Sequence, residues 1–220
     1  MTSSYFDPSS HDIFDIVRTT RAMRRLKPDP VPDELIIKIL EAGTCAANGG
    51  NQQSWHFLVL KDVAVKKAVQ FWYKKALHEI VAPIHAAHGP PAGSTDEKYR
   101  RQLQAVEYLT EHYHEAPVWI VACINHEKSE PSRMDGASIY PAVQNMLLAA
   151  RALGLGASLT TRHLCFEKEA DVALQLPPGY VSYAILPVGY PLGNFGPVRR
   201  GRLADVVSLD RVGRRWDLLK

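Results

Sequence analysis

The chain has 220 residues, a hydrophobic fraction of 46%, a charged fraction of 22% and a formal net charge of +3. This length supports a substantial core, and the composition is ordinary for a globular protein. No apolar run is long enough to cross a bilayer, and the first residues lack the basic and apolar regions of a signal peptide. We therefore expect a single domain over residues 1–220 that is cytoplasmic and has no membrane partner.

Two helices are predicted in the first 45 residues. The first follows Ser10, which is a favourable N-cap, and its apolar residues recur at helical spacing over 11–18. Three prolines in 27–32 exclude regular helix there. An acidic pair then opens a second helix over 35–42, and Gly43 marks its end.

The middle of the chain alternates buried strands with helices. Short apolar runs indicate the strands, and helical periodicity indicates the helices. Proline and glycine mark the breaks between them. The pattern predicts a strand at 56–60, a helix at 63–80, breaks at Pro83 and 89–93, a helix at 96–114 and a strand at 118–124.

The clearest helical pattern in the chain covers 135–153. Its apolar residues repeat at helical spacing, and Gly154 ends it. An extended segment at 156–161, a short helix at 167–174 and a strand at 181–188 follow, and the tail from Gly193 has little periodicity. The order of the elements predicts an α+β fold, with helices packed around a mixed, mainly antiparallel sheet.

Arginines gather near both ends of the chain. Arg21, Arg24 and Arg25 follow the first helix, and Arg199, Arg200 and Arg202 lie near the C-terminus. Between them in sequence, 46–55 is rich in Asn and Gln and contains two glycines that permit close approach to a ligand. Because arginine pairs with phosphate in a bidentate manner, a phosphorylated cofactor with a polar ring system is the natural candidate. Such clustering favours a specific anion site over a nucleic-acid surface.

The cysteines and histidines show no spacing that indicates a metal site or a disulfide pair. Cys45, Cys123 and Cys165 are widely spaced without a CxxC pair, so reduced thiols are expected, with Cys123 buried in an apolar run. The histidines between 78 and 114 have no cysteine beside them, so a solvated surface is favoured over a metal site.

Together, these segments resemble the FMN-dependent nitroreductase-like flavoprotein family. The family's Arg-Arg-Ser-x-Arg-x-Phe element corresponds to Thr20-Arg21-Ala22-Met23-Arg24-Arg25-Leu26, and its Asn/Gln/Trp element corresponds to 46–55. The helix over 135–153 is similar to its long core helix. Its closing segment corresponds to 186–191 followed by Arg199, Arg200 and Leu203. The similarity covers nearly the whole chain in the family's order.

The resemblance implies an intertwined homodimer with a C-terminal extension and two FMN sites at the subunit interface. Hydride would pass from NAD(P)H to the flavin, and then in ping-pong fashion to a nitroaromatic, a quinone or a similar small-molecule acceptor, with no catalytic protein nucleophile. A lid over about 70–115 would cover the flavin. The implied cofactor-binding residues are Thr20, Arg21, Ala22, Arg24, Asn48, Asn51, Gln53, Ser158, Leu159, Thr160, Arg199 and Arg200.

Two departures from the family pattern leave alternatives open. Ala22 stands where the family has a phosphate-binding serine, and Thr20 stands where it has an arginine. Phosphate binding would therefore depend on Arg21, Arg24 and Arg200. The alternatives are a flavin-sequestering protein of the same fold without productive turnover, and a flavoenzyme of the reductive dehalogenase type.

Overall fold

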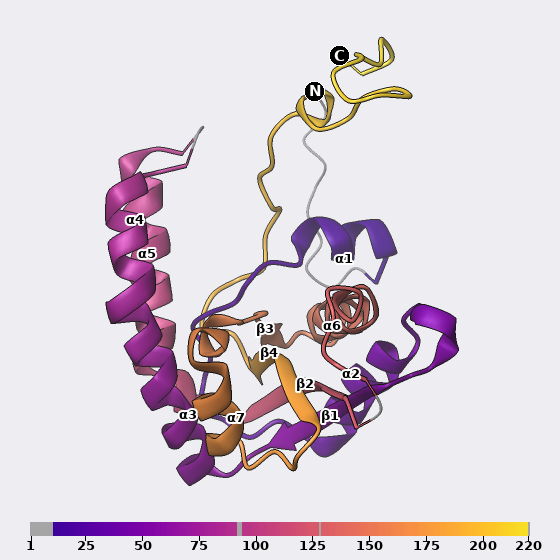
Figure 1. Cartoon of the computed structure of the whole chain (residues 1–220). Coiled ribbons are helices and arrows are strands. Elements are labelled where there is room, and N and C mark those ends of the chain that lie inside the picture. The colour runs from indigo at the N-terminus through magenta and orange to yellow at the C-terminus, as the bar shows by residue number, and fades with distance from the viewer. Residues whose placement is uncertain (1–10, 92–93, 128, 220) are drawn as a thin grey trace.

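Four strands form one sheet in the order β1-β2-β4-β3, and every strand pair among the described residues is antiparallel. The strands are β1 (Trp55–Leu60), β2 (Val118–Asn125), β3 (Gly156–Ala157) and β4 (Tyr180–Gly189). The structure is a computed structural model that describes residues 11–91, 94–127 and 129–219 (Figure 1). The predicted α+β class, the strand positions and the mainly antiparallel character of the sheet are confirmed, and no parallel strand pair occurs among the described residues.

The central strand β2 is buried on both faces, because its alternate side chains face two separate cores. Val118, Ile120 and Ala122 belong to the core beneath α2 (Asp33–Thr44) and α6 (Gly136–Ala152). The intervening Trp119, Val121 and Cys123 belong to the core beneath the opposite helices. A strand covered in this way reads as a continuous apolar run, as this one does.

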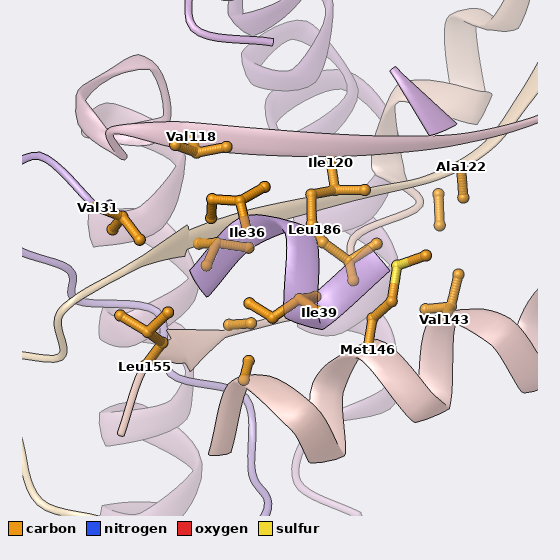
Figure 2. Close-up of a cluster of buried hydrophobic side chains, with 14 of the residues drawn as sticks. Val31, Ile36, Ile39, Val118, Ile120, Ala122, Val143, Met146, Leu155 and Leu186 are labelled. Carbon is orange, nitrogen blue, oxygen red and sulfur yellow. The ribbon is translucent and has the colours of Figure 1, made fainter. Parts of the chain in front are cut away.

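Helices α2 and α6 meet directly over the first face of the sheet. Ile36 and Ile39 of α2 lie with Val143 and Met146 of α6 in one cluster of buried side chains (Figure 2). Helix α2 extends past its predicted end, and Gly43 lies inside it. A Cβ at Gly43 would stand 2.3 Å from Met146 Cε, so this glycine permits close helix contact and does not end the helix.

Helices α3 (Val63–Ala76), α5 (Asp96–Glu111) and α7 (Glu167–Ala173) lie toward the other face. The predicted break at Pro83 is wrong: a π turn, Leu77–Val81, leads from α3 directly into α4 (Ala82–His88). Proline is tolerated in the first turn of a helix because no backbone N–H is needed there. Helices α4 and α5 form a hairpin that projects from the body (Figure 1).

Two helix ends also differ from the sequence prediction. Helix α1 (Ile13–Thr19) is capped by Asp12, whose side chain accepts from the N–H groups of Phe14 and Asp15, while the predicted cap Ser10 lies outside the described residues. Helix α5 ends at Glu111, three residues before the predicted end, and a 3-10 turn follows at Tyr113–Glu115.

The segment from Gly193 to Leu219 is irregular apart from one 3-10 turn, Leu203–Asp205. It starts beside α1, where the N–H of Val198 donates to the carbonyl of Arg18 at 2.8 Å, and then runs away from the sheet (Figure 1). Within the described ranges, no helix has the length and apolar character needed to span a membrane.

Asp171 of α7 is expected to make the stability of the fold depend on pH. Burial raises the pKa of its carboxyl to about 6, although the Ser182 hydroxyl and N–H donate to it and partly offset that rise. The unfolded value is about 3.9. Between these two values the folded chain binds the proton more tightly, so the free energy of unfolding decreases as pH rises from about 4 to about 6.

The variant Asp171→Asn keeps an oxygen acceptor for Ser182 and removes the titration. We expect the native chain to gain stability relative to this variant as pH is lowered from about 6 to about 4. Urea unfolding of both proteins across this range measures the difference. Parallel stability curves would contradict the raised pKa of Asp171.

Candidate functional site

A cavity of about 510 Å³ lies between α1, the segment after it, the middle of α6, the residues after β3 and the C-terminal tail. Its volume is within the ~300–1,000 Å³ of small-molecule sites. Three arginines, Arg18, Arg21 and Arg200, line it together with Gln144 and Leu147 of α6, and none of its described lining residues is acidic. A concave surface with several guanidinium groups and no carboxylate is suited to an anionic ligand.

Helix α1 and two hydrogen bonds place Arg21 at this cavity. The hydroxyl of Thr20 donates to the carbonyl of Ile16 at 2.7 Å and closes the last turn of the helix. The N–H of Met23 then donates to the carbonyl of Ala157 at 3.0 Å, which ties the following segment to β3. Thr20, Arg21 and Ala22 are therefore held along one wall of the cavity.

The segment after Arg21 can approach β3 closely because residue 156 is glycine. A Cβ there would lie 2.8 Å from Leu26 Cδ2 and 2.9 Å from Met23 Cβ. Gly156 in turn pairs with Gly189 at the end of β4. A larger residue at 156 would push the arginine-bearing segment away from the sheet.

Ser158 contributes a polar atom that the protein itself leaves unsatisfied. The residue is 1% exposed and lines the cavity, and its Oγ has no hydrogen-bond partner among the described residues. A buried hydroxyl without a partner costs about 1–3 kcal/mol, so its presence at a cavity wall points to a polar ligand atom. Its neighbour Leu159 also lines the cavity and is 41% exposed.

Thr160, in contrast, has both of its donors engaged within the protein. Its N–H and its hydroxyl donate to the carbonyl of Ile185, at 3.0 and 2.6 Å. Its Oγ1 also lies 2.6 Å from the buried hydroxyl of Tyr113, whose pKa burial raises. Thr160 does not line the cavity and serves to join this segment to β4.

The Asn/Gln loop lies away from the cavity of its own chain. The N–H of Gly49 donates to Ser138 Oγ near the start of α6, at 3.1 Å, and the N–H of Gln53 donates to Asn48 Oδ1 at 2.9 Å. Asn51 and Gln53 have positive φ angles of 53° and 50°, which residues other than glycine rarely adopt. Neither these two residues nor Asn48 lines the cavity. Backbone strain of this kind is concentrated at functional sites.

The remaining predicted arginines, Arg24 and Arg199, are not among the lining residues of the cavity. Arg24 is partly buried, and the pKa of its guanidinium is lowered by burial and then by nearby Arg162 and Arg21. Arg199 is exposed, and its carbonyl accepts from Arg200 at 3.0 Å. Neither lines the cavity, and no lining residue comes from the predicted lid at 70–115.

Sequence reasoning missed Arg18, Gln144 and Leu147 as lining residues. Gln144 and Leu147 lie three residues apart in α6, so they share a helix face, and that spacing could have indicated them. Arg18 lies in the last turn of α1 and forms an ion pair with Asp15 at 3.6 Å. A basic residue in the last turn of a helix is favourable on its own, so its position in the sequence gives no sign of a ligand contact.

Comparisons with known proteins give one family model and several similar proteins. The family model described as the nitroreductase family matches residues 17–190. An NADH dehydrogenase of Thermus thermophilus is 29% identical over 201 residues, which cover 85% of this chain and 90% of the relative. The iodotyrosine deiodinase of Thermotoga neapolitana is 28% identical over 179 residues, which cover 81% of this chain and 88% of the relative. The crystal structure of an oxidized iodotyrosine deiodinase bound to FMN and 3-iodo-L-tyrosine superposes with a TM-score of 0.69 at 22% identity, covering 87% of this chain and 96% of that one.

Proposed function

The chain belongs to the nitroreductase family, and on this basis we propose that it is an FMN-dependent oxidoreductase. It takes hydride equivalents from NAD(P)H and delivers electrons to an electron-poor acceptor such as a nitroaromatic or a quinone. The observation that carries the proposal is the cavity lined by Arg18, Arg21 and Arg200, with no acidic lining residue among those described. When bound there, FMN supplies the redox chemistry, so no protein nucleophile is needed.

The cavity residues divide into a charged part and a polar part. Arg21 and Arg200 would bind the phosphate through charge-assisted hydrogen bonds, which compensates for the absence of a serine at position 22. The Ser158 hydroxyl would donate to a polar atom of the ring, and this contact would remove the cost of leaving it buried without a partner. Leu147 and Leu159 would exclude water from the ring.

Ser158→Ala separates a ligand role of this hydroxyl from a structural one. Because its Oγ has no protein partner, we expect the stability of the FMN-free variant to be unchanged or increased by up to about 1 kcal/mol. We expect FMN affinity to decrease by roughly five- to tenfold. Thermal unfolding of the FMN-free protein and titration with FMN measure the two effects. A destabilised variant with native FMN affinity would contradict the proposed role.

The active unit in this proposal is a homodimer. Ile13, Phe14 and Val17 of α1 are 55%, 65% and 50% exposed, and Val206 and Val212 of the tail are 80% and 100% exposed. A second copy would cover these apolar residues, and its Asn48–Gln53 loop would complete the cavity of the first. The α4–α5 hairpin would act as the cover on the acceptor side. Sedimentation of the native protein and of Phe14→Asp tests the assembly: a native monomer would contradict it.

Steady-state NAD(P)H oxidation distinguishes turnover from flavin sequestration. We expect the FMN-loaded protein to oxidise NADH or NADPH in proportion to an added quinone or nitroaromatic. FMN-loaded protein that fails to turn over with either nucleotide would favour the sequestering alternative. Because relatives include an iodotyrosine deiodinase, halide release from 3-iodotyrosine is the second product to assay.

A further inference from the structure

A second cavity, of about 440 Å³, lies between the segment before α2, the start of α3 and the start of β2. Six of its ten lining residues are prolines or valines, so its walls are mainly apolar. It shares no lining residue with the arginine-lined cavity. The proposed oxidoreductase chemistry makes no use of it.

The cationic group at this cavity is the buried side chain of Lys66. This residue of α3 is 2% exposed, and its ammonium donates to the carbonyls of Ala116 and Pro117, at 2.8 and 3.4 Å. An ammonium carries three N–H groups, so these two carbonyls leave one donor. Among the described residues, no carboxylate lies within ion-pair distance of it. Burial lowers the pKa of Lys66, and the nearby carboxylate of Asp62 opposes part of that shift.

The other charged lining residues already have partners. Lys61 is paired with Asp33, and Glu115 accepts from His112 Nδ1 at 2.9 Å. Lys61 and Glu115 are exposed, so Lys66 is the one buried charged residue among the described lining residues.

His114 lines the same cavity as a neutral donor–acceptor group. Its Nδ1 lies 2.7 Å from Gln70 Oε1. The Gln70 amide nitrogen donates to the carbonyls of Thr110 and Glu111, so its oxygen is the acceptor and His114 Nδ1 carries the proton. Burial lowers the pKa of His114 despite the opposing effect of Glu115.

We propose that this cavity binds a small monocarboxylate with a compact apolar body, with its carboxylate on Lys66 Nζ and its body against the prolines and valines. One buried cationic group, with one N–H beyond its two carbonyl contacts, matches a monoanion. A phosphate dianion would require more donors than these residues provide. The bound carboxylate supplies a counter-charge at hydrogen-bond distance, closer to the ammonium than the carboxylate of Asp62.

Calorimetric titration of the full-length, FMN-loaded protein with 3-methylbutanoate tests the proposal. We expect saturable binding of one equivalent per chain, and binding at least about tenfold weaker for the neutral isostere 3-methylbutanamide. The visible spectrum of the bound flavin stays unchanged, because the two cavities are separate. Equal binding of acid and amide, or no saturable binding of the acid, overturns the proposal.

Two matched variants assign the site. Lys66→Met keeps the length of the side chain and removes its charge, and we expect a loss of about tenfold or more in affinity for the acid. Lys67→Met changes the adjacent, exposed lysine and is expected to leave the affinity unchanged. Native affinity in a folded Lys66→Met protein overturns the assignment. If that variant does not fold, the comparison of acid with amide on the native chain still tests whether the cavity binds a carboxylate.

Discussion

Replacing both Arg21 and Arg200 with glutamine is expected to weaken FMN binding by about 10²- to 10⁴-fold. Both residues line the arginine-lined cavity, from opposite ends of the sequence, and no acidic lining residue offsets their charge. A hydrogen bond to a charged group contributes about 1.5–3 kcal/mol, or roughly ten- to a hundredfold in affinity for each arginine. Titration of the FMN-free protein, followed by quenching of FMN fluorescence, measures the dissociation constants.

Arg25→Gln is the matched control for this pair. Arg25 belongs to the same segment as Arg21, but its guanidinium lies 5.0 Å from the centre of the Tyr108 ring and does not line the cavity. We expect its FMN affinity to stay within about threefold of the native value. If the double variant binds FMN as tightly as this control, the phosphate is held elsewhere.

Met146→Ala is expected to destabilise the fold by about 2–5 kcal/mol, the usual cost of truncating a fully buried methionine. Met146 is 0% exposed and fills the contact between α6 and Gly43 of α2. The cavity left there cannot collapse easily, because the backbones of both helices are fixed by the sheet beneath them. Urea unfolding monitored by circular dichroism measures the change.

Met134→Ala provides the comparison on a second methionine of the chain. Met134 is 81% exposed, so its truncation removes little packing, and we expect a change within about 0.5 kcal/mol. Equal effects of the two substitutions would mean that the α2–α6 contact contributes little to stability. The same α6 carries Gln144 and Leu147, so we also expect weaker FMN binding in Met146→Ala than in Met134→Ala.

The strands and most helices could be predicted because their signals are local. The run 118–124 is apolar throughout, and the face of α6 repeats at helical spacing, so neither needs tertiary context to be recognised. The break predicted at Pro83 was wrong because its signal is not local. Whether a proline breaks a helix or starts the next one depends on the turn before it, and a π turn at Leu77–Val81 leaves no trace in periodicity.

The cavity could be predicted only in part, because its residues come from five separate elements. Position in the family pattern indicated Arg21, Arg200 and Ser158, and these do line one cavity. Thr160 looked equivalent to Ser158 in sequence, yet its donors are used by Ile185, which lies 25 residues away. Hydrogen bonds at such separations follow from the register of β4 and not from any local motif. The contribution of loop 48–53 to the cavity of a second copy is a prediction that a structure of the dimer would test.

The most direct test of the proposed function is the absorbance spectrum of the purified protein after desalting with FMN, recorded before and after anaerobic addition of NADH or NADPH. We predict retained flavin bands that bleach with at least one nucleotide. Retained flavin that neither nucleotide bleaches would contradict the proposed turnover. Loss of all flavin on desalting, even at high protein concentration, would contradict the assignment of the arginine-lined cavity itself.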